Sequence, residues 1–378
     1  MNLFLNPKLQ LAALIVVAAV MAVTGFNADP YGIGVAIVGA TIGNTVLTLA
    51  DWAKRLDPDG KVPTIVELLS QTNRILDDML FKEGNLPTGE RVTVRTGLPS
   101  VAWRLLNQGV PNSKSTTAQV DEHCGMLEAR SQVDKDLAEL NGNVEAFRLS
   151  EAQAFIEAMN QEMASTVIYG NSGTAPEEFL GLAPRYNSLG ATNKQNILSA
   201  GGASSDNTSI WLVVWGANTV YGVFPKGSKA GLIHEDLGLD DAFDANNRRF
   251  RAYMDWWQWK CGLVVKDWRF AVRIANIDVS DLVAGTGTQA VNASTAIIKL
   301  MARAIDRIPS LGMGRPVFYA NRTVMSHLRV QALEKSTNAL SFTEAINQFG
   351  ERVQTGLTFL GIPVRQVDAI LETEGAVS

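Results

Sequence analysis

The strongest hydrophobic pattern in the chain is helical and lies near its centre. Apolar side chains recur at three- and four-residue spacing along SEAQAFIEAMNQEMASTVIY, which places them on one face of an α-helix. The residues of that face are Phe155, Met159 and Met163, with Ile156 and Val167 beside them. Ser150 is a suitable N-cap, and Gly170 is a suitable residue to end the helix. We therefore predict one long helix over residues 150–169.

Three stretches show strand patterns. Valine alternates with Arg and Thr in RVTVRT, and SIWLVVWG (209–216) is an apolar run of strand length. In DWRFAVRIANID the alternation is strict, and its apolar face is predicted to comprise Trp268, Phe270, Val272 and Ile274. The opposite face contains Arg269, Ala271 and Arg273. We predict a strand with one buried face here.

The last third of the chain alternates between helical and strand patterns. Helices are predicted in ASTAIIKLMARAIDRIPS (293–310) and TVMSHLRVQALEK (323–335). A strand is predicted in RPVFYAN (315–321), and two short strands in the closing GLTFLGIPVRQVDAIL (356–371). This part of the chain therefore combines helices with a sheet.

The stretch from Gly84 to Glu122 predicts a long two-stranded excursion. It begins with the RVTVRT strand pattern, is interrupted by glycine and proline residues, and returns through TTAQVDE. It has too little apolar surface for a core of its own, and an isolated two-stranded ribbon is only marginally stable in water. Something outside this stretch must therefore hold it.

Residues 1–43 differ in composition from the rest of the chain. The first 50 residues contain two charged side chains, Lys8 and Asp29. The 13-residue apolar run Leu11–Val23 is shorter than the ~20 residues of a membrane span. Three interpretations are open: a targeting or membrane segment, an arm that orders against neighbouring subunits, or upstream sequence translated from an early start codon. We favour the last two together, with the working protein beginning near Asn44.

The overall composition indicates a globular protein with a large core. Apolar residues make up 46% and charged residues 19% of the chain. The formal net charge is −5, and Lys and Arg are dispersed, which argues against nucleic-acid binding as the main activity. The two cysteines, Cys124 and Cys261, allow at most one disulfide, and we expect two reduced, partly buried thiols.

The sequence contains no recognisable catalytic motif. A Gly-x-Ser-x-Gly elbow, a P-loop and a dinucleotide-binding glycine pattern are all missing. His123 and Cys124 are adjacent, and neighbours on a strand point to opposite faces. His234, beside Glu235 and Asp236, is more typical of an exposed loop than of a metal site. We predict no catalytic residue, no metal site and no cofactor, and hence a protein that is not an enzyme.

Four of the eight tryptophans lie within DWWQWKCGLVVKDWRF. An exposed cluster could bind a sugar or stack on a base, and a buried one could form a sheet core with a rim that another subunit covers. Trp268 alternates into a predicted strand, which favours the core. The core aromatic residues are expected to be Trp211, Trp215, Trp257, Trp259, Trp268 and Phe270. The alternative is a carbohydrate-binding or enzymatic β-rich protein that uses the Trp256–Trp268 cluster.

An ordered set of stretches between Asn44 and the C-terminus adds a further signal. They include TLADWAKRLDPDGK, EGNLPTGERVTVRTGLPSVAWRLLNQGV, SEAQAFIEAMNQEMASTVIYGNSGTAPEEFLGLAPRYN, WLVVWGANTVYGVFPKGSKAGL and LGIPVRQVDAIL. Taken in this order, they resemble the major capsid proteins of tailed double-stranded-DNA bacteriophages of the short-tailed type. The apolar residues 1–43 do not resemble the charged, helical scaffolding region that some relatives cleave off.

The resemblance implies an α+β fold, that of the tailed-phage and herpesvirus major capsid proteins. This fold has an N-terminal arm, an extended β-ribbon loop, a peripheral domain with a long spine helix, and an axial domain. The implied boundaries are 1–43 for the apolar extension, 44–83 for the arm, 84–122 for the extended loop, 123–290 for the peripheral domain with spine helix 150–169 and a β-sheet, 291–350 for the axial domain, and 351–378 for C-terminal strands that return to the peripheral sheet.

The resemblance also implies partners and a location. Subunits of this kind assemble as hexamers and pentamers into an icosahedral shell around viral double-stranded DNA. Scaffolding, portal and decoration proteins are further candidate partners, packaged DNA would be bound only non-specifically, and no membrane is expected. The location would be the virion capsid, after assembly in the bacterial host cytoplasm. The residues of the extended loop expected to contact a neighbour are Arg91, Arg95, Trp103, Arg104 and Lys114.

Two other hypotheses predict different behaviour in solution. A carbohydrate-binding protein would be a stable monomer. A membrane protein anchored by residues 11–42 would need detergent until it is truncated at Asn44. A capsid subunit would instead need residues 84–122 for assembly but not for its own folding.

Overall fold

The computed structural model describes most of the chain from residue 70 onward, within one compact unit that comprises residues 47–378. The described ranges are 70–140, 143–244, 246–283, 288–333, 340–346 and 352–378. The predicted extension 1–43 and most of the predicted arm 44–83 lie outside the described residues. The described end of the arm forms a short helix, α3 (Ile75–Asp78), and a short strand, β1 (Phe81–Glu83).

One strand, β6 (Asn207–Trp215), is buried at every residue. The strands linked to it are β5 (Ile197–Ser199), β10 (Ala271–Asp278), β11 (Arg315–Ala320), β12 (Leu340–Ile346), β13 (Arg352–Phe359) and β14 (Ile362–Gln366). β6 lies between β10 and β11, antiparallel to both, and the sheet continues through β14 and β13 to β12. The apolar run predicted at 209–216 is therefore a strand with both faces covered, which is why it does not alternate.

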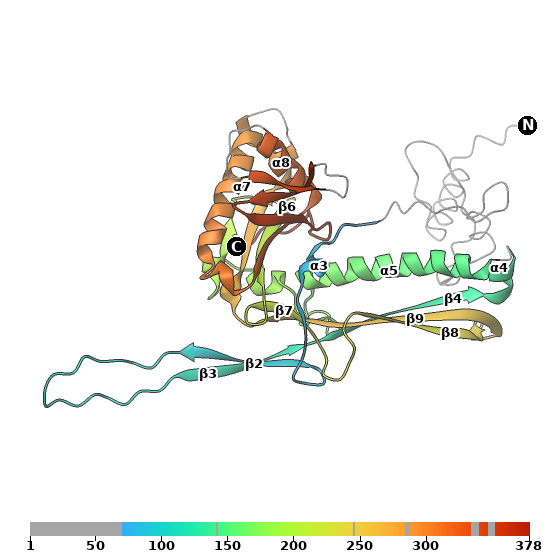
Figure 1. Ribbon diagram of the computed structural model, residues 1–378, viewed down its shortest axis with the longest axis horizontal. Coiled ribbons are helices and arrows are strands. Elements are labelled where there is room, and N and C mark those ends of the chain that lie inside the picture. The colour runs from blue at the N-terminus through green and yellow to red at the C-terminus, as the bar shows by residue number, and fades with distance from the viewer. Residues whose placement is uncertain (1–69, 141–142, 245, 284–287, 334–339, 347–351) are drawn as a thin grey trace, which may run out of the picture. The chain divides into compact units, whose positions relative to one another are not determined.

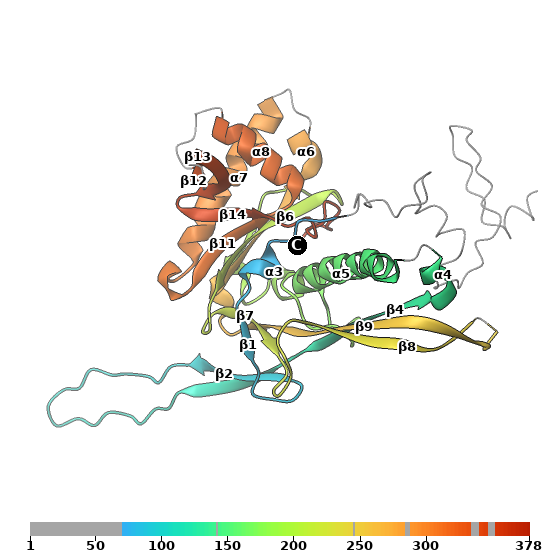
Figure 2. The same ribbon diagram turned by 45° about the vertical axis from the view of Figure 1, so that its right-hand side comes forward.

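Three helices lie together over this part of the sheet, as Figure 2 shows. They are α6 (Val279–Val283), α7 (Thr288–Arg307) and α8 (Arg322–Leu333). Met301 of α7 and Leu328 of α8 are buried in the same apolar cluster as Trp211 and Phe318 of the sheet. The helices and strands predicted for the last third of the chain are confirmed.

A long strand, β9 (Arg249–Val265), joins this region to a second group of strands. The strands of this group are β7 (Val220–Phe224), β4 (Gly125–Asp134) and β8 (Leu232–Phe243). The end of β9 pairs with β7, and its earlier residues pair with β4 on one edge and β8 on the other. Trp256, Trp257 and Trp259 lie inside β9, a strand that the sequence patterns did not predict. Bulky side chains on both faces of β9 hide the alternation.

The long helix, α5 (Val144–Tyr169), runs alongside β4 and β9, as Figure 1 shows. It begins six residues earlier than predicted, because the side chain of Asn143, and not of Ser150, caps it by accepting the N–H of Ala146. Its end at Gly170 is as predicted. A Cβ at Gly170 would lie 2.6 Å from the carbonyl oxygens of both Thr166 and Phe179, so close packing requires glycine there.

The predicted two-stranded excursion is confirmed. β2 (Gly89–Gly97) and β3 (Thr116–His123) pair antiparallel with each other in a separate sheet, and residues 98–115 connect them (Figure 1). Their register places Glu90 opposite Glu122 and Arg91 opposite Asp121. We call β2, β3 and this connection the ribbon, and residues 98–115 its tip.

The strand prediction around Trp268 is partly wrong. Residues Trp268–Phe270 form a turn of 3₁₀ helix, and the strand starts only at Ala271. Of the predicted polar face, Arg269 is exposed, but Ala271 and Arg273 are buried. The guanidinium of Arg273 lies 2.9 Å from the Glu374 carboxylate and is 5% exposed. Alternation of residue types therefore misled here, because an internal ion pair allows an arginine inside the sheet.

We expect Trp211→Ala to lower the free energy of unfolding by about 3–5 kcal/mol, since it removes a fully buried ring from the core. Urea unfolding of the soluble subunit measures this. Trp103→Ala is the matched control, because Trp103 is fully exposed, and its unfolding curve should overlay that of the unchanged chain. Equal loss in both variants would contradict the core assignment.

Candidate assembly surface

The tip of the ribbon exposes large apolar side chains that nothing in the described part of the chain covers. The exposed members are Leu98, Val101, Trp103, Leu105, Leu106 and Val110. Trp103 is 104% exposed and Val101 is 93% exposed. Soluble monomers rarely display contiguous apolar patches, so this group has the character of a contact surface.

The five residues predicted for inter-subunit contact lie along the ribbon, but one of them is already paired within the subunit. Arg91 is engaged within the ribbon, because its Nε and Nη2 donate to the Asp121 carboxylate across the strand pair at 2.6 and 2.7 Å. This hydrogen bonding raises the pKa of Arg91 and lowers that of Asp121. The other four are exposed: Arg95, Trp103, Arg104 and Lys114. The three basic side chains among them form no ion pair with a described residue.

The root of the ribbon is the end of the strand pair where Glu90 lies opposite Glu122. An ion pair that no sequence pattern indicates fixes this root. Arg185, in the 3₁₀ turn η1 (Ala183–Tyr186), donates from both terminal nitrogens to the Glu122 carboxylate at 2.7 Å each. Its remaining donors reach the carbonyl oxygens of Leu180, Gly181 and Leu263. Glu122 is the penultimate residue of β3, so the ribbon is attached to the core at this point. The two residues are 63 positions apart, and no local pattern connects them.

A second pair supports the other strand of the ribbon at the same level. Glu90 accepts a hydrogen bond from Lys82 at 3.1 Å and is buried opposite Glu122. Tyr221 lies close to it: burial and the Glu90 carboxylate raise the pKa of the Tyr221 hydroxyl. Two buried carboxylates facing each other across a strand pair would repel, and each is therefore matched by its own cation.

The predicted aromatic core divides into two groups. Trp211, Trp215 and Phe270 are buried in the main core, with Trp259 and Trp268 partly buried against it. Trp257 is buried elsewhere: it stacks on Phe155 of α5 at 5.1 Å and on His234 at 5.2 Å. Four of the six residues are therefore buried, two are only partly buried, and the six do not form one cluster.

His234 lies in strand β8 and not in a loop, contrary to the prediction. Its Nε2 is 3.0 Å from Asp255 Oδ1, and its ring stacks on Trp257. Arg148 of α5 bridges Asp255 and Asp236 at 2.8 and 2.6 Å. The cluster ties the helix to the β8–β9 hairpin, and no group of metal-ligating side chains occurs among the described residues.

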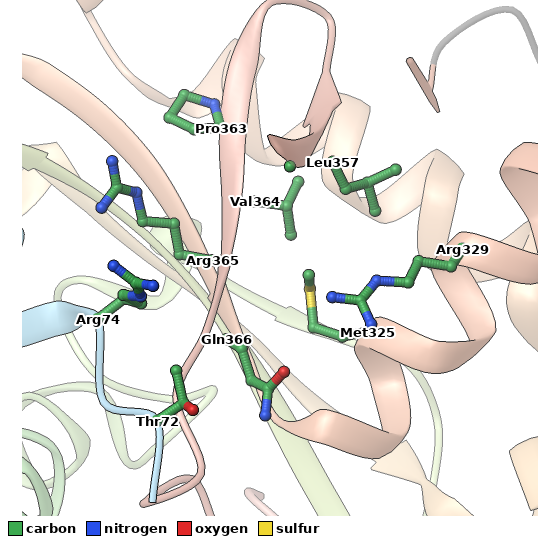
Figure 3. Close-up of a pocket in the computed structure, with 10 residues that line it drawn as sticks. Thr72, Arg74, Met325, Arg329, Leu357, Pro363, Val364, Arg365 and Gln366 are labelled. Carbon is green, nitrogen blue, oxygen red and sulfur yellow. The ribbon is translucent and has the colours of Figure 1, made fainter. Parts of the chain in front are cut away.

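One cavity is basic in character. Three arginines, Arg74, Arg329 and Arg365, surround a space of about 480 Å³ beside Met325 and Val364 (Figure 3). Arg365 already pairs with the buried Asp78 at 3.1 Å, and Arg74 lies 3.6 Å from Asp77. An anion fits this chemistry, but much of the positive charge is balanced internally.

No helix among the described residues is long and apolar enough to cross a membrane.

We expect Arg185→Met to cost about 3–5 kcal/mol of unfolding free energy, because it leaves the buried Glu122 carboxylate without its cation. Chemical denaturation measures the cost. Arg91→Met, which breaks an exposed pair in the same ribbon, is the matched control and should leave the midpoint almost unchanged. If both variants unfold at the same denaturant concentration as the unchanged chain, the Arg185–Glu122 pair does not hold the root.

Both cysteines are free, as predicted, and we expect them to resist alkylation in the folded chain. Burial, together with the nearby Glu90 carboxylate, raises the pKa of Cys124 to about 12. Burial also raises the pKa of Cys261 well above its usual value. Because the thiolate is the reactive form, a thiol reagent at pH 8 should label neither residue until denaturant is added. Rapid labelling of the native subunit would contradict this.

The chain is similar to known proteins in sequence and in fold. A family model described as major capsid protein GP7 matches residues 57–378. The chain is 37% identical to a chain in the structure of bacteriophage Epsilon15, covering 90% of this chain and 99% of that chain with a TM-score of 0.68. The capsid of a native GTA particle matches with 11% identity, covering 62% and 99% of the two chains, at a TM-score of 0.39. A comparison with curated proteins found no match.

Proposed function

Because the chain belongs to the family of major capsid proteins GP7, we propose that its ribbon is the element by which each subunit binds a neighbouring subunit in the shell. The protein is a structural component of the virion capsid that associates with copies of itself, and it is not an enzyme. Its fold is the α+β fold of tailed-phage capsid proteins. The carbohydrate-binding alternative has no support among these matches.

The observation that carries the proposal is the exposed tip on a firmly held root. Leu98, Trp103 and Leu106 are each more than four-fifths exposed. Burying such side chains stabilises a complex by about 1.5–3 kcal/mol each. At the root, the Arg185–Glu122 pair keeps the ribbon attached to the core. The described part of the chain therefore offers an apolar tip with nothing of its own to cover it.

The remaining assignments follow from the same premise. We take α5 as the spine helix of a peripheral domain within residues 123–290, and residues 291–350 as part of the axial domain. Strands β5, β6 and β10 lie within the range 123–290, but they belong to the same sheet as β11, so we assign them to the axial sheet. The closing strands β13 and β14 pair with β12 and β11, so we place residues 352–366 with the axial strands and not with the peripheral sheet as first expected. Assembly as hexamers and pentamers, in the host cytoplasm and with scaffolding, portal or decoration proteins, completes the proposal.

We expect the double variant Trp103→Ser/Leu106→Ser to give folded, soluble subunits that do not form shells, because the tip loses the apolar area that drives contact. Negative-stain electron microscopy and sedimentation measure assembly, and far-UV circular dichroism checks the fold. Leu371→Ser, which removes one half-exposed apolar side chain elsewhere, is the control and should assemble normally. Normal shells from the double variant would contradict the role of the tip.

A further inference from the structure

The composition of the tip indicates the chemistry of the surface that would receive it. Residues 92–120, which are the tip and only the adjoining parts of β2 and β3, contain three basic side chains and no Asp or Glu. They are Arg95, Arg104 and Lys114. The receiving surface should therefore be acidic, partly apolar, and able to pair with extended backbone.

Strand β8 (Leu232–Phe243) has all three properties. It contains four carboxylates and no Lys or Arg: Glu235, Asp236, Asp240 and Asp241. Asp236 and Asp241 pair with arginines of the same subunit, whereas Glu235 and Asp240 form no ion pair with a described residue. The same strand exposes three apolar side chains, Leu232, Leu237 and Phe243, at 36%, 37% and 51%.

The backbone of β8 is also available on one side. β8 pairs with β9 along its whole length, and no described strand pairs with its other edge. Such an edge presents a row of free N–H and C=O groups that can accept another strand. The tip is complementary, because β2 ends at Gly97 and β3 begins only at Thr116, so residues 98–115 form no strand ladder among the described residues.

We propose that the tip of one subunit adds as a strand to the free edge of β8 in a second copy of the chain. Main-chain hydrogen bonds would supply the pairing, and the apolar side chains of both segments would lie against each other. Arg104 and Lys114 would face the unpaired Glu235 and Asp240. This inference rests on the proposed function of the ribbon and names the surface that the ribbon contacts.

The acidic character of β8 also disfavours the pairing of two copies of β8 with each other. Two copies of β8 placed edge to edge would bring carboxylates together, which disfavours that contact. The register shift between Asp236 and Gly238, where Gly238 adopts φ +72°, interrupts the strand further. Edge strands are commonly protected in this way, and the same charges favour a basic partner strand. The tip of a neighbouring subunit is such a strand.

Cross-linking between two populations of full-length subunits tests the contact directly. One population carries Arg104→Cys and the other Asp240→Cys, and the native cysteines remain because both are shielded. Co-assembled particles under mild oxidation should give a disulfide-linked dimer of the two populations. The comparison pair is Arg104→Cys with Glu145→Cys, which offers the exposed start of α5 as the acceptor. Equal or stronger cross-linking to Glu145→Cys would overturn the β8 assignment.

A charge exchange tests the same contact in solution. Glu235→Lys/Asp240→Lys alone, or Arg104→Glu/Lys114→Glu alone, should reduce the yield of shells by roughly tenfold or more, because like charges then face each other. Combining all four changes in one chain should restore assembly. Glu162→Lys/Glu177→Lys, with the same change of charge at exposed positions elsewhere, should assemble normally.

The two levels of inference fail in different ways. Loss of assembly in Trp103→Ser/Leu106→Ser would show that the tip is needed. If, in addition, the charge exchange gives no rescue and no cross-link forms to Asp240→Cys, β8 is not the acceptor of the tip. If Trp103→Ser/Leu106→Ser assembles normally, the proposed function of the ribbon is itself wrong. A folding defect is excluded in each variant by circular dichroism of the soluble subunit, and the cross-linking result does not depend on the charge variants.

Discussion

The ion pair between Arg185 and Glu122 fixes the ribbon to the rest of the subunit. A two-stranded ribbon has no core of its own, so its direction is defined only where it joins a packed structure. Arg185 provides that definition because its donors are divided between the Glu122 carboxylate and three backbone carbonyls of the core. The guanidinium cannot turn without breaking several hydrogen bonds at once. The ribbon is thus held at its root while its tip remains exposed.

The subunit consequently separates two physical tasks. The fold is stabilised by the sheet around β6, a strand that is buried at every residue within the main apolar cluster. In the function proposed above, association uses the apolar surface that the described part of the chain leaves exposed at the tip. Because the driving force for association is the burial of that surface, a subunit can be fully folded and still have a strong tendency to associate. A shell protein needs both properties.

Buried charges connect distant parts of the chain in the same way. Asp78, at the end of the arm, has no exposed side-chain surface and pairs with Arg315 and Arg365 at 3.0 and 3.1 Å. Glu374, near the C-terminus, pairs with Arg273 and accepts from Tyr169. Removing one partner of such a pair leaves an uncompensated charge in the interior, which is costly. These pairs therefore attach both ends of the described chain to the sheet.

The sequence by itself determined the long helix, the strand 209–216, the two-stranded excursion and the helices and strands of the last third. Each of these follows from a local pattern of apolar residues. Tertiary structure alone decided the burial of Arg273, the tryptophans inside β9 and the attachment of Glu122 to Arg185. These features depend on residues far apart in sequence, or on strands with both faces covered, where alternation disappears. Local periodicity indicates which face of a helix or strand is buried. Contacts between residues far apart in sequence are defined only by the folded structure.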